Sequence, residues 1–440
     1  MRLPDYFRYA TNISTDLTEI LPPLSLLYII GNSKYNIDFI DNRIKKYSFE
    51  ELSEILMQYD VIGFGGTIFE IKQARQLSVY LISQGKTTIY GGPNATVNWN
   101  LYLGFFSIIF RGEAELEFDN VIDNLDKLQE IGFTKLNNTF VNLQPFRINE
   151  LDNLNYPDRT KINLDDYRRT VQNYLGDTKP IDMVVSSRGC PFDCYFCSSK
   201  VIWNQRYTYR SIDNLIKEIQ FMIDEYGTKG LYFREDNFTT NRKRLLEFCE
   251  KIKDFGLVWL CESRVDTVDE ATLKSMAQAG CKGIWFGIES TDNEVLKKIR
   301  KNTTYDQIKS TIDLCNQFNI TSGGGFMLGF PFEDKESIIR NYKSSKTLKL
   351  KVCFYNRIWA IPVSEMHSQI INEGLDYYSF ENIVLPGTKD LTADEVNKLY
   401  YKLVSRKEKY RKKLAQMMGK KVVAFIRKKS PSLYSIVEKL

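Results

Sequence analysis

Three cysteines lie close together in the sequence at the spacing of a metal–sulfur site. Cys190, Cys194 and Cys197 are separated by three and then two residues. Cysteine thiolates are the usual ligands of a [4Fe–4S] cluster, and three of them leave one iron without a protein ligand. A zinc site would need a fourth Cys or His at matching distance, but His367, the only histidine, lies far downstream. The spacing therefore favours an iron–sulfur cluster with one open iron.

A repeated strand–helix pattern positions these cysteines. From Pro180 onward, six apolar strands alternate with six amphipathic helices, which predicts most of a parallel α/β barrel but not a closed eight-stranded one. The strands are expected at 181–186, 230–234, 258–264, 283–288, 321–328 and 351–361. The helices are expected at 212–226, 242–255, 269–279, 293–299, 305–318 and 335–348. The cysteines follow the first strand directly, and barrel active sites lie at such carboxyl ends.

The segment around the cysteines, Ser-Arg-Gly-Cys-Pro-Phe-Asp-Cys-Tyr-Phe-Cys-Ser at 187–198, resembles the signature of the radical S-adenosylmethionine (SAM) superfamily. The resemblance implies that the amino and carboxyl groups of SAM chelate the open iron. It implies that one electron from the cluster cleaves SAM and produces a 5′-deoxyadenosyl radical. It places Phe196 against the adenine and calls for a reductant such as flavodoxin or ferredoxin.

Four further residues and one strand resemble the SAM contacts of that family. Glu235 and Asp236 stand where the amino group is bound, Arg264 where the carboxylate is bound, and Glu289 where the ribose is bound. The glycine-rich stretch 323–331 resembles the strand against which the adenosine packs. The alternatives are helix capping for the first pair, a barrel ion pair for the arginine, and a structural or packing role for the others.

The region 1–140 also alternates strands and helices, with glycine turns between them. Strands are expected at 24–30, 60–64, 86–90 and 107–110, and helices over 49–59, up to Gln84 and up to about Leu128. Such an order predicts a parallel doubly wound sheet. Ligands of these sheets bind at the carboxyl ends of the strands, where the glycine turns fall.

This first region, placed before a Cys-containing barrel, resembles one subgroup of the family: radical SAM proteins with an N-terminal B12-binding-like domain. The segments 60–67, 90–94, 110–115 and 156–159 carry this resemblance. The region contains no histidine, so any cobalamin would bind without a histidine ligand from it, and cobalamin binding stays open. The residues expected to lie against a cobalamin are Gly65, Gly66, Thr67, Gly91 and Gly92.

The resemblance and the composition together predict the domain organisation. A B12-binding-like domain is expected at 1–140, a linker at 141–179, the partial barrel at 180–362 and a basic helical region at 363–440. A net charge of +5 gives no general argument for nucleic-acid binding. We see no secretory signal and no membrane span, so a cytoplasmic protein is expected. The basic tail forms either a helical cap on the barrel or a docking site for an acidic partner.

Three functions remain open at this point. The first is an enzyme that abstracts hydrogen with the deoxyadenosyl radical and methylates its substrate through cobalamin. The second is a cobalamin-independent epimerase, cyclase or dehydrogenase. An epimerase needs a hydrogen donor, for which Cys353 and Cys261 are the candidates. The third is an electron-transfer or sensing iron–sulfur protein. All five scattered cysteines are expected to be buried packing thiols, and the donor role is the alternative for Cys261 and Cys353; the other three are Cys249, Cys281 and Cys315.

Overall fold

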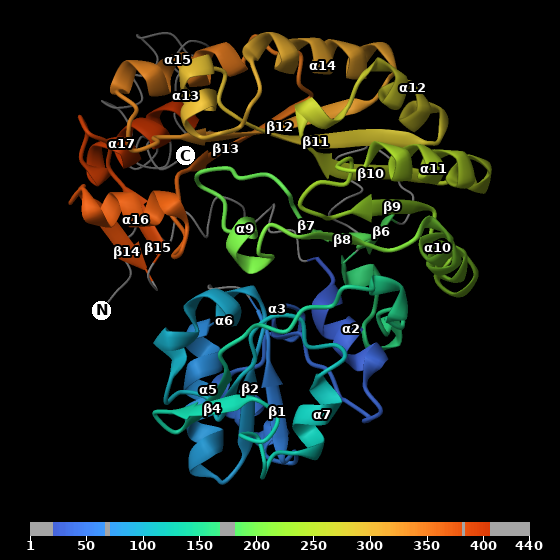
Figure 1. The fold of residues 1–440 in the computed structure, drawn as a ribbon, viewed down its shortest axis with the longest axis vertical. Helices are drawn as coiled ribbons and strands as arrows, with labels where there is room; N and C mark the ends of the chain where they lie inside the picture. Colours follow the sequence, from blue (N-terminus) through green and yellow to red (C-terminus); the bar gives the residue numbers. More distant parts are fainter. Residues whose placement is uncertain (1–20, 67–70, 168–180, 381–382, 405–440) are drawn as a thin grey trace, which may run out of the picture.

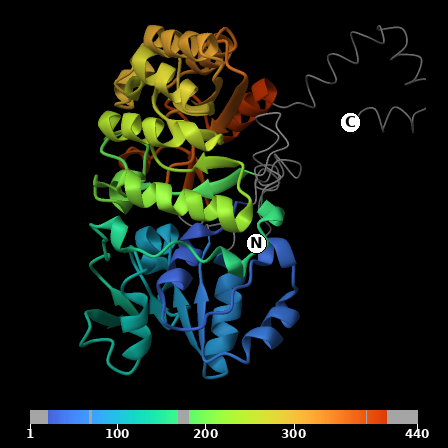
Figure 2. The same ribbon diagram turned by 90° about the vertical axis from the view of Figure 1, so that its right-hand side faces the viewer.

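The protein consists of two α/β halves, each built on one main sheet (Figure 1). The computed structural model describes residues 21–66, 71–167, 181–380 and 383–404. The first half holds a five-stranded sheet in the order β1-β2-β3-β5-β4, and the second half holds a six-stranded sheet in the order β13-β12-β11-β10-β9-β6. A view turned by 90° shows the halves stacked one on the other (Figure 2). The predicted α/β class, with a wound sheet before a partial barrel, is confirmed.

The first sheet is parallel except at one edge. Its parallel strands are β1 (Val61–Phe64), β2 (Thr87–Tyr90), β3 (Ile108–Ile109) and β5 (Thr139–Asn142), and β4 (Phe133–Leu136) pairs antiparallel with β5. The sequence did not lead us to this β4–β5 hairpin. Its two-residue turn, Asn137 and Asn138, has φ values of 45° and 60°. Positive φ at both positions matches the twist of the flanking strands, and asparagine tolerates it. The Asn-Asn pair in the sequence could therefore have predicted the turn of this hairpin.

The strand predicted over 24–30 is wrong: these residues form the helix α2 (Leu24–Asn32). A short continuous apolar run does not distinguish a buried strand from a buried helix. The helix begins after Pro23, whose missing N–H costs nothing at that position. Its apolar side packs on Ile148 and Leu151. The remaining helices of this half are α3 (Asn42–Lys45), α4 (Phe49–Leu56), α5 (Ile71–Ser83), α6 (Pro93–Asn98) and α7 (Phe118–Asp123).

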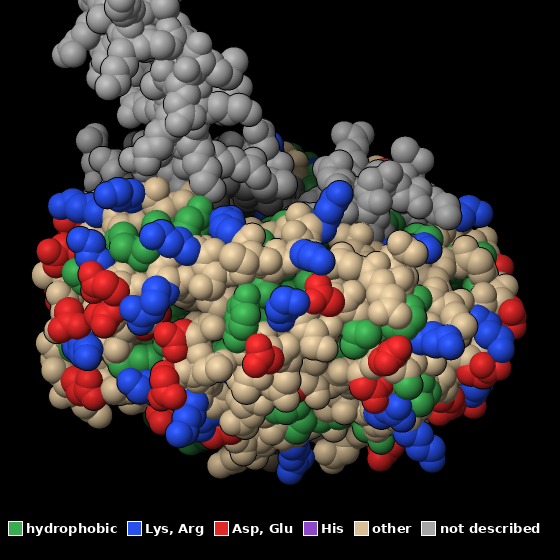
Figure 3. Space-filling model, turned by 90° about the horizontal axis from the view of Figure 1, so that it is seen from above, with side chains coloured by type: hydrophobic (Ala, Val, Ile, Leu, Met, Phe, Trp, Pro, Cys, Tyr) green, Lys and Arg blue, Asp and Glu red, His purple; other side chains and the backbone are tan. Residues whose placement is uncertain are grey.

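The second half is the predicted partial barrel of six parallel strands. Its strands are β6 (Ile181–Val184), β9 (Gly230–Phe233), β10 (Val258–Ser263), β11 (Cys281–Glu289), β12 (Thr321–Leu328) and β13 (Val352–Arg357). Helices cover the outer side of this sheet (Figure 1), namely α10 (Ile212–Tyr226), α11 (Arg242–Ile252), α12 (Glu270–Gln278), α13 (Asn293–Lys298), α14 (Tyr305–Gln317) and α15 (Lys335–Ser345). The inner side faces the first half, and on the outer surface cationic and anionic side chains are interspersed (Figure 3).

The helix α10 shows why these segments fold as predicted. The Ser211 side chain accepts a hydrogen bond from the Asn214 amide and caps the first turn, and Gly227 ends the helix with a φ of 61°. Between these caps, Leu215 and Ile219 are completely buried against the sheet. Apolar residues at this spacing form one face of a helix, which is why the sequence located it well.

The main core lies between the six-stranded sheet and its helices, and it holds the scattered cysteines. Cys261 is fully buried in this core, and Cys353 borders it. Both therefore lie on the helix side of the sheet, whereas the inner side is formed by a different set of residues that includes Leu260 and Trp285. This placement does not support either of them as a hydrogen donor to a substrate inside the barrel. Three further cysteines are buried packing thiols, as expected: Cys249, Cys281 and Cys315.

Smaller elements surround the barrel. They are β7 (Ser187–Gly189), α9 (Ser199–Ile202), β8 (Tyr207–Tyr209), α16 (Glu365–Asn372), β14 (Tyr377–Phe380), β15 (Ile383–Pro386) and α17 (Ala393–Val404). The region 363–440 thus contains a hairpin besides its helices, and the basic tail beyond 404 lies outside the described residues. Among the described helices, none combines the length and the apolar character needed to cross a bilayer. The predicted domain boundaries stay predictions.

Candidate active site

The three predicted cluster cysteines lie on one loop between β7 and α9. Gly189, the residue before Cys190, has a φ of 85°, and a Cβ there would lie 2.0 Å from the carbonyl oxygen of Arg206. Only glycine fits this close backbone approach. Within the loop, the Cys197 amide donates to the Cys194 carbonyl oxygen at 3.1 Å. The loop is therefore a tight turn that keeps the three thiols near one another.

Three thiols on one loop supply the donor set of a [4Fe–4S] cluster with one open iron. Burial raises the pKa of Cys197 to about 12 and also raises that of Cys190, with neighbouring thiols adding to each shift. Metal binding overcomes such shifts, because a coordinating thiol loses its proton outright. In the described part of the chain, no three His, Cys, Asp or Glu side chains converge on one point to hold a single metal ion. A cubane does not require convergence, since each cysteine binds a different iron.

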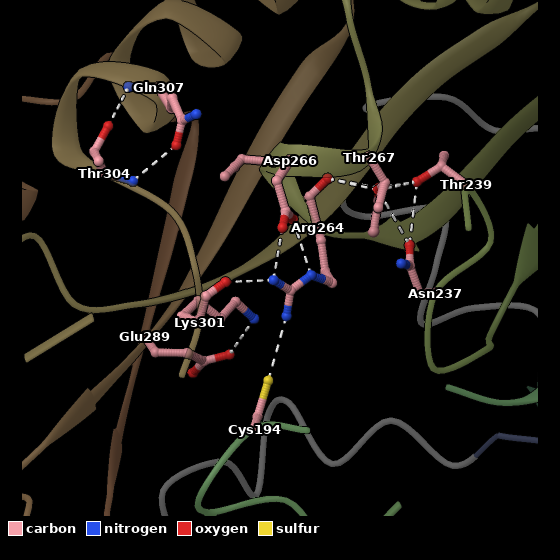
Figure 4. Close-up of polar contacts among 12 residues, drawn as sticks. Cys194, Asn237, Thr239, Arg264, Asp266, Thr267, Glu289, Lys301, Thr304 and Gln307 are labelled. Carbon is pink, nitrogen blue, oxygen red and sulfur yellow. Dashed lines mark hydrogen bonds and ion pairs between the residues drawn. The ribbon is translucent and has the colours of Figure 1, made fainter. Parts of the chain in front are cut away.

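Arg264 contacts the cysteine loop, at the end of β10 (Figure 4). Its guanidinium donates to the Cys194 sulfur at 3.3 Å and to both carboxylate oxygens of Asp266 at 2.9 and 2.7 Å. It also donates to the backbone carbonyl of Lys301 and lies 3.8 Å from the centre of the Phe192 ring. The sequence placed this arginine near SAM but did not reveal Asp266 as its partner. The alternative interpretation of Arg264, as a member of a barrel ion pair, thus describes its contact with Asp266.

Glu289 ends β11 in a backbone conformation that is unusual for a residue with a side chain. Its φ is 68°, and the pairing with β12 shifts register between Gly287 and Glu289. Its carboxylate accepts a hydrogen bond from Lys301 Nζ at 3.3 Å (Figure 4). A Cβ at Gly287 would lie 2.7 Å from this carboxylate. Local strain of this kind persists where the surrounding structure holds it, and it is concentrated at functional sites.

Lys301 is a site residue that the sequence did not reveal. Its side chain is 6% exposed and pairs with Glu289, while its backbone carbonyl accepts from Arg264. It therefore connects the arginine that contacts the cysteine loop to the acid at the end of β11. No motif marks this lysine, since its position depends on how the chain returns between α13 and α14.

Glu235 and Asp236 lie behind the cysteine loop. Glu235 accepts hydrogen bonds from the Ser186 amide at 2.5 Å and from the Ser187 hydroxyl. Asp236 accepts from the Ser199 hydroxyl at 3.0 Å, next to the cysteines. Burial raises the pKa of both carboxyl groups. Neither residue caps the following helix, because the side chain of Asn241 fills that role for α11. The contacts of this pair thus brace the segments on both sides of the cysteines.

Phe196 and the end of β12 close the site on another side. The Phe196 ring lies 6.0 Å from that of Phe330, in the loop after β12. Glu333 holds this loop by accepting from the amides of Gly329 and Phe330 at 3.1 and 2.8 Å, and burial raises the pKa of Glu333 to about 7. In β12 itself, a Cβ at Gly323 would overlap the Trp285 ring, at 1.6 Å from its nearest atom. Gly323 therefore has a packing role, which is the alternative given above for the glycine-rich stretch 323–331.

The strand-end glycines of the first sheet differ in the space that they leave. A Cβ at Gly92 would have no heavy atom within 4 Å, and at Gly91 the nearest atom would lie at 3.9 Å. At Gly65, by contrast, a Cβ would lie 2.9 Å from the Leu26 side chain of α2. Other protein atoms thus do not crowd the backbone at the end of β2. Thr67 lies outside the described residues.

Buried ion pairs join the two halves next to the cysteines. Arg188, two residues before Cys190, donates to Glu113 at 2.5 Å and to Glu115 at 2.7 Å. These acids follow β3 of the first sheet, and the arginine side chain is 10% exposed. The arginine also lies 5.5 Å from the centre of the Tyr28 ring of α2. The carboxyl end of the first sheet is therefore fastened to the loop that carries the cysteines.

Comparisons with known proteins agree with this geometry. Residues 184–344 match the model of the radical SAM superfamily. The chain is 28% identical to an uncharacterized methyltransferase of Pyrococcus horikoshii over 87% of this chain and 86% of the relative. It is also similar in fold to TsrM of Kitasatospora setae, a radical SAM methyltransferase solved with cobalamin and a [4Fe–4S] cluster, with a TM-score of 0.66, 14% identity and coverage of 88% and 83%. OxsB, a cobalamin-dependent SAM radical enzyme, matches with a TM-score of 0.62, 15% identity and coverage of 84% and 63%.

Proposed function

This chain belongs to the radical SAM superfamily, and we propose that it is a methyltransferase that uses cobalamin as a second cofactor. As a member of that family it is an enzyme that works with a [4Fe–4S] cluster and SAM. The observation that carries the proposal is the junction described above. There the segment that follows β3 of the first sheet meets the cysteine loop, and Arg188 fastens one to the other through Glu113 and Glu115.

Each residue of the site has a proposed task. Cys190, Cys194 and Cys197 would hold the cluster, which when bound supplies the single electron that cleaves SAM. Arg264 positions the loop through Cys194 and presents positive charge to the SAM carboxylate. Glu289, held by Lys301, offers a carboxylate to the ribose hydroxyls. Arg264 and Lys301 are buried, so their contacts fix the geometry of these polar groups before SAM binds.

The first sheet would hold the cobalamin at its carboxyl edge. At Gly91 and Gly92 no protein atom crowds the backbone, so a flat ring could approach it, and α6 begins directly after them. No histidine of the first half is available as a cobalt ligand, since His367 belongs to α16 in the second half. The relatives named as methyltransferases support a methyl group as the group transferred.

Expression with added hydroxocobalamin, followed by corrin analysis of the purified protein, tests the cofactor. We expect about one corrin per chain, with an electron paramagnetic resonance spectrum that lacks coupling to a histidine nitrogen. A Gly91→Val variant should lose the corrin and keep the iron, because Gly91 has no positive φ and the new side chain would project where the ring is proposed to lie. A parent protein that produces 5′-deoxyadenosine at full rate without any corrin would instead favour the cobalamin-independent alternatives.

Glu289→Gln should weaken SAM binding by about 10- to 100-fold, because it replaces a charged acceptor of ribose hydrogen bonds with a neutral one. The iron content should stay unchanged, since Glu289 does not contact the cysteine loop directly. Calorimetric titration of the anaerobic, cluster-loaded protein with SAM measures this. Arg264→Ala should weaken SAM binding as well. Glu250→Gln, in an exposed pair with Lys253, is the matched control and should bind SAM like the parent. Parental affinity in both site variants would contradict the assignment.

A further inference from the structure

We propose that three arginines and two tryptophans beside the cysteine loop form the docking surface for a small acidic electron-carrier protein. This arginine–tryptophan surface consists of Arg111, Arg147, Arg206, Trp99 and Trp203. The inference rests on the proposed function, because only an enzyme with a redox cluster needs such a partner. It deepens that function by assigning a site of electron entry.

The positive charge of this surface is not neutralised within the described chain. Burial lowers the pKa of Arg111 and of Arg147. The nearby charge of Arg147 lowers the pKa of Arg111 further, and the nearby charge of Arg206 does the same to Arg147. The charge of Glu113 also acts on Arg147, but that carboxylate is paired with Arg188. Among the described residues, no acidic side chain forms an ion pair with any of the three. Adjacent like charges repel each other, and an acidic partner would relieve that repulsion while speeding its own approach.

Neutral contacts hold the arginines in place. Arg111 donates to the carbonyl oxygens of Thr96 and Leu143, at 3.2 and 2.5 Å, and lies 5.3 Å from the centre of the Trp99 ring. Such contacts fix the direction of a guanidinium without cancelling its charge, so the group is oriented before a partner arrives.

The second part of the surface has the same construction. Arg206 donates to the side chain of Asn149 at 3.3 Å, and Arg147 lies 5.6 Å from the centre of the Trp203 ring. Val201, on the short helix α9 that directly precedes Trp203, is 39% exposed. Arginine and tryptophan are the residues that most often dominate binding at protein interfaces, and an exposed apolar neighbour favours a protein partner over a free anion.

The surface lies directly over the cysteine loop. A Cβ at Gly189 would be 3.0 Å from the Trp203 Cβ, so the tryptophan packs against the residue that precedes Cys190. Trp203 also lies near Asp236, because it contributes to lowering the pKa of that carboxyl group against the larger effect of burial. Asp236 accepts a hydrogen bond from Ser199, two residues after Cys197. In Figure 1, α9 lies at the side of the barrel that faces the first half, where α6 packs on it. A protein bound here would meet the cysteine loop through one indole ring.

The electron balance of the step is simple. The reduced carrier, a flavin or iron–sulfur protein with an acidic surface, is oxidised by one electron, and the cluster is reduced by that same electron. No proton transfer and no further reactant are required. The carrier then leaves, and screening of surface charges by salt should weaken its binding.

Charge reversal on this surface provides the test. Full-length, cluster-loaded parent protein, Arg206→Glu and the double variant Arg147→Glu/Arg206→Glu would be titrated with oxidised flavodoxin by calorimetry. Each would then be assayed for 5′-deoxyadenosine with reduced flavodoxin and, separately, with dithionite. Lys127→Glu/Lys335→Glu changes the net charge by the same amount as the double variant, at exposed positions outside the surface, and serves as the control.

We expect the double variant to bind flavodoxin at least about tenfold more weakly than the parent and to lose its flavodoxin-driven rate in proportion. Arg206→Glu, at an exposed position, should show a smaller loss in the same direction. Dithionite-driven rates should match the parent in all variants. Equal flavodoxin binding in parent and double variant would overturn the surface while leaving the enzyme assignment intact. Equal loss with both reductants would also overturn it, because the arginines would then serve substrate or cofactor binding. No 5′-deoxyadenosine from the parent with dithionite would instead contradict the proposed function.

Discussion

Replacing Cys190, Cys194 and Cys197 together by alanine is expected to remove the iron, the brown chromophore and SAM cleavage at once. A reconstituted parent should carry about four irons and four sulfides per chain, and the triple variant about none. The reason is that the other cysteines cannot substitute: those on the barrel are buried in the core between the sheet and its helices or border it. Iron and sulfide analysis, the visible spectrum and assay of 5′-deoxyadenosine measure the three effects.

A matched control separates cluster loss from general damage. Cys353→Ser changes a half-buried thiol that borders the core and does not lie on the loop, so it should keep the full iron content. The triple variant should also remain folded, because two of its three thiols are only partly buried. A triple variant that still cleaves SAM would contradict the assignment of the cluster and, with it, the proposed mechanism.

The barrel was predictable because each of its segments carries its own signal. The helices have apolar residues on one face and capping residues at their ends, as α10 shows with Ser211 and Gly227. The glycines that end β2 were equally visible. By contrast, residues 24–30 are almost all apolar, so they show neither the alternation of a strand nor the 3.6-residue repeat of a helix. The packing of α2 on Ile148 and Leu151 decides that this segment is a helix.

The site was predictable in its residues but less so in their partners. The cysteine motif and the positions of Arg264 and Glu289 follow from local sequence. Their contacts do not: Asp266 fills the fork of Arg264, and Lys301 reaches Glu289 from a loop twelve residues away. Partners of this kind depend on how separate strands converge at one edge of the sheet, which spacing along the chain does not encode. The SAM and cobalamin contacts therefore stay predictions.

The contact between the two halves was the largest feature that the sequence did not reveal. Arg188 was read only as part of the cysteine motif, and Glu113 and Glu115 only as part of a strand-end loop. In the fold they are direct partners across more than seventy residues of sequence. One oxygen of Glu115 is buried without a hydrogen-bond partner in the described chain, so the arginine is its main source of compensation.

Arg188→Met is expected to destabilise the protein by about 3–5 kcal/mol, because it leaves two buried carboxylates side by side without their cation. Urea unfolding of the metal-free chain, followed by fluorescence, should show the shift as a lower midpoint. In the triple variant Arg188→Met/Glu113→Gln/Glu115→Gln the charges are gone together. The new side-chain carbonyl at position 113 would still accept from the Ile148 amide, which Glu113 binds at 2.9 Å. The midpoint of this variant should return close to that of the parent, since removing a whole buried charge group is often nearly neutral. If Arg188→Met unfolds at the parental midpoint, the ion pairs do not hold the halves together. If the triple variant is as unstable as the single one, the loss comes from side-chain packing around Tyr28 and not from uncompensated charge.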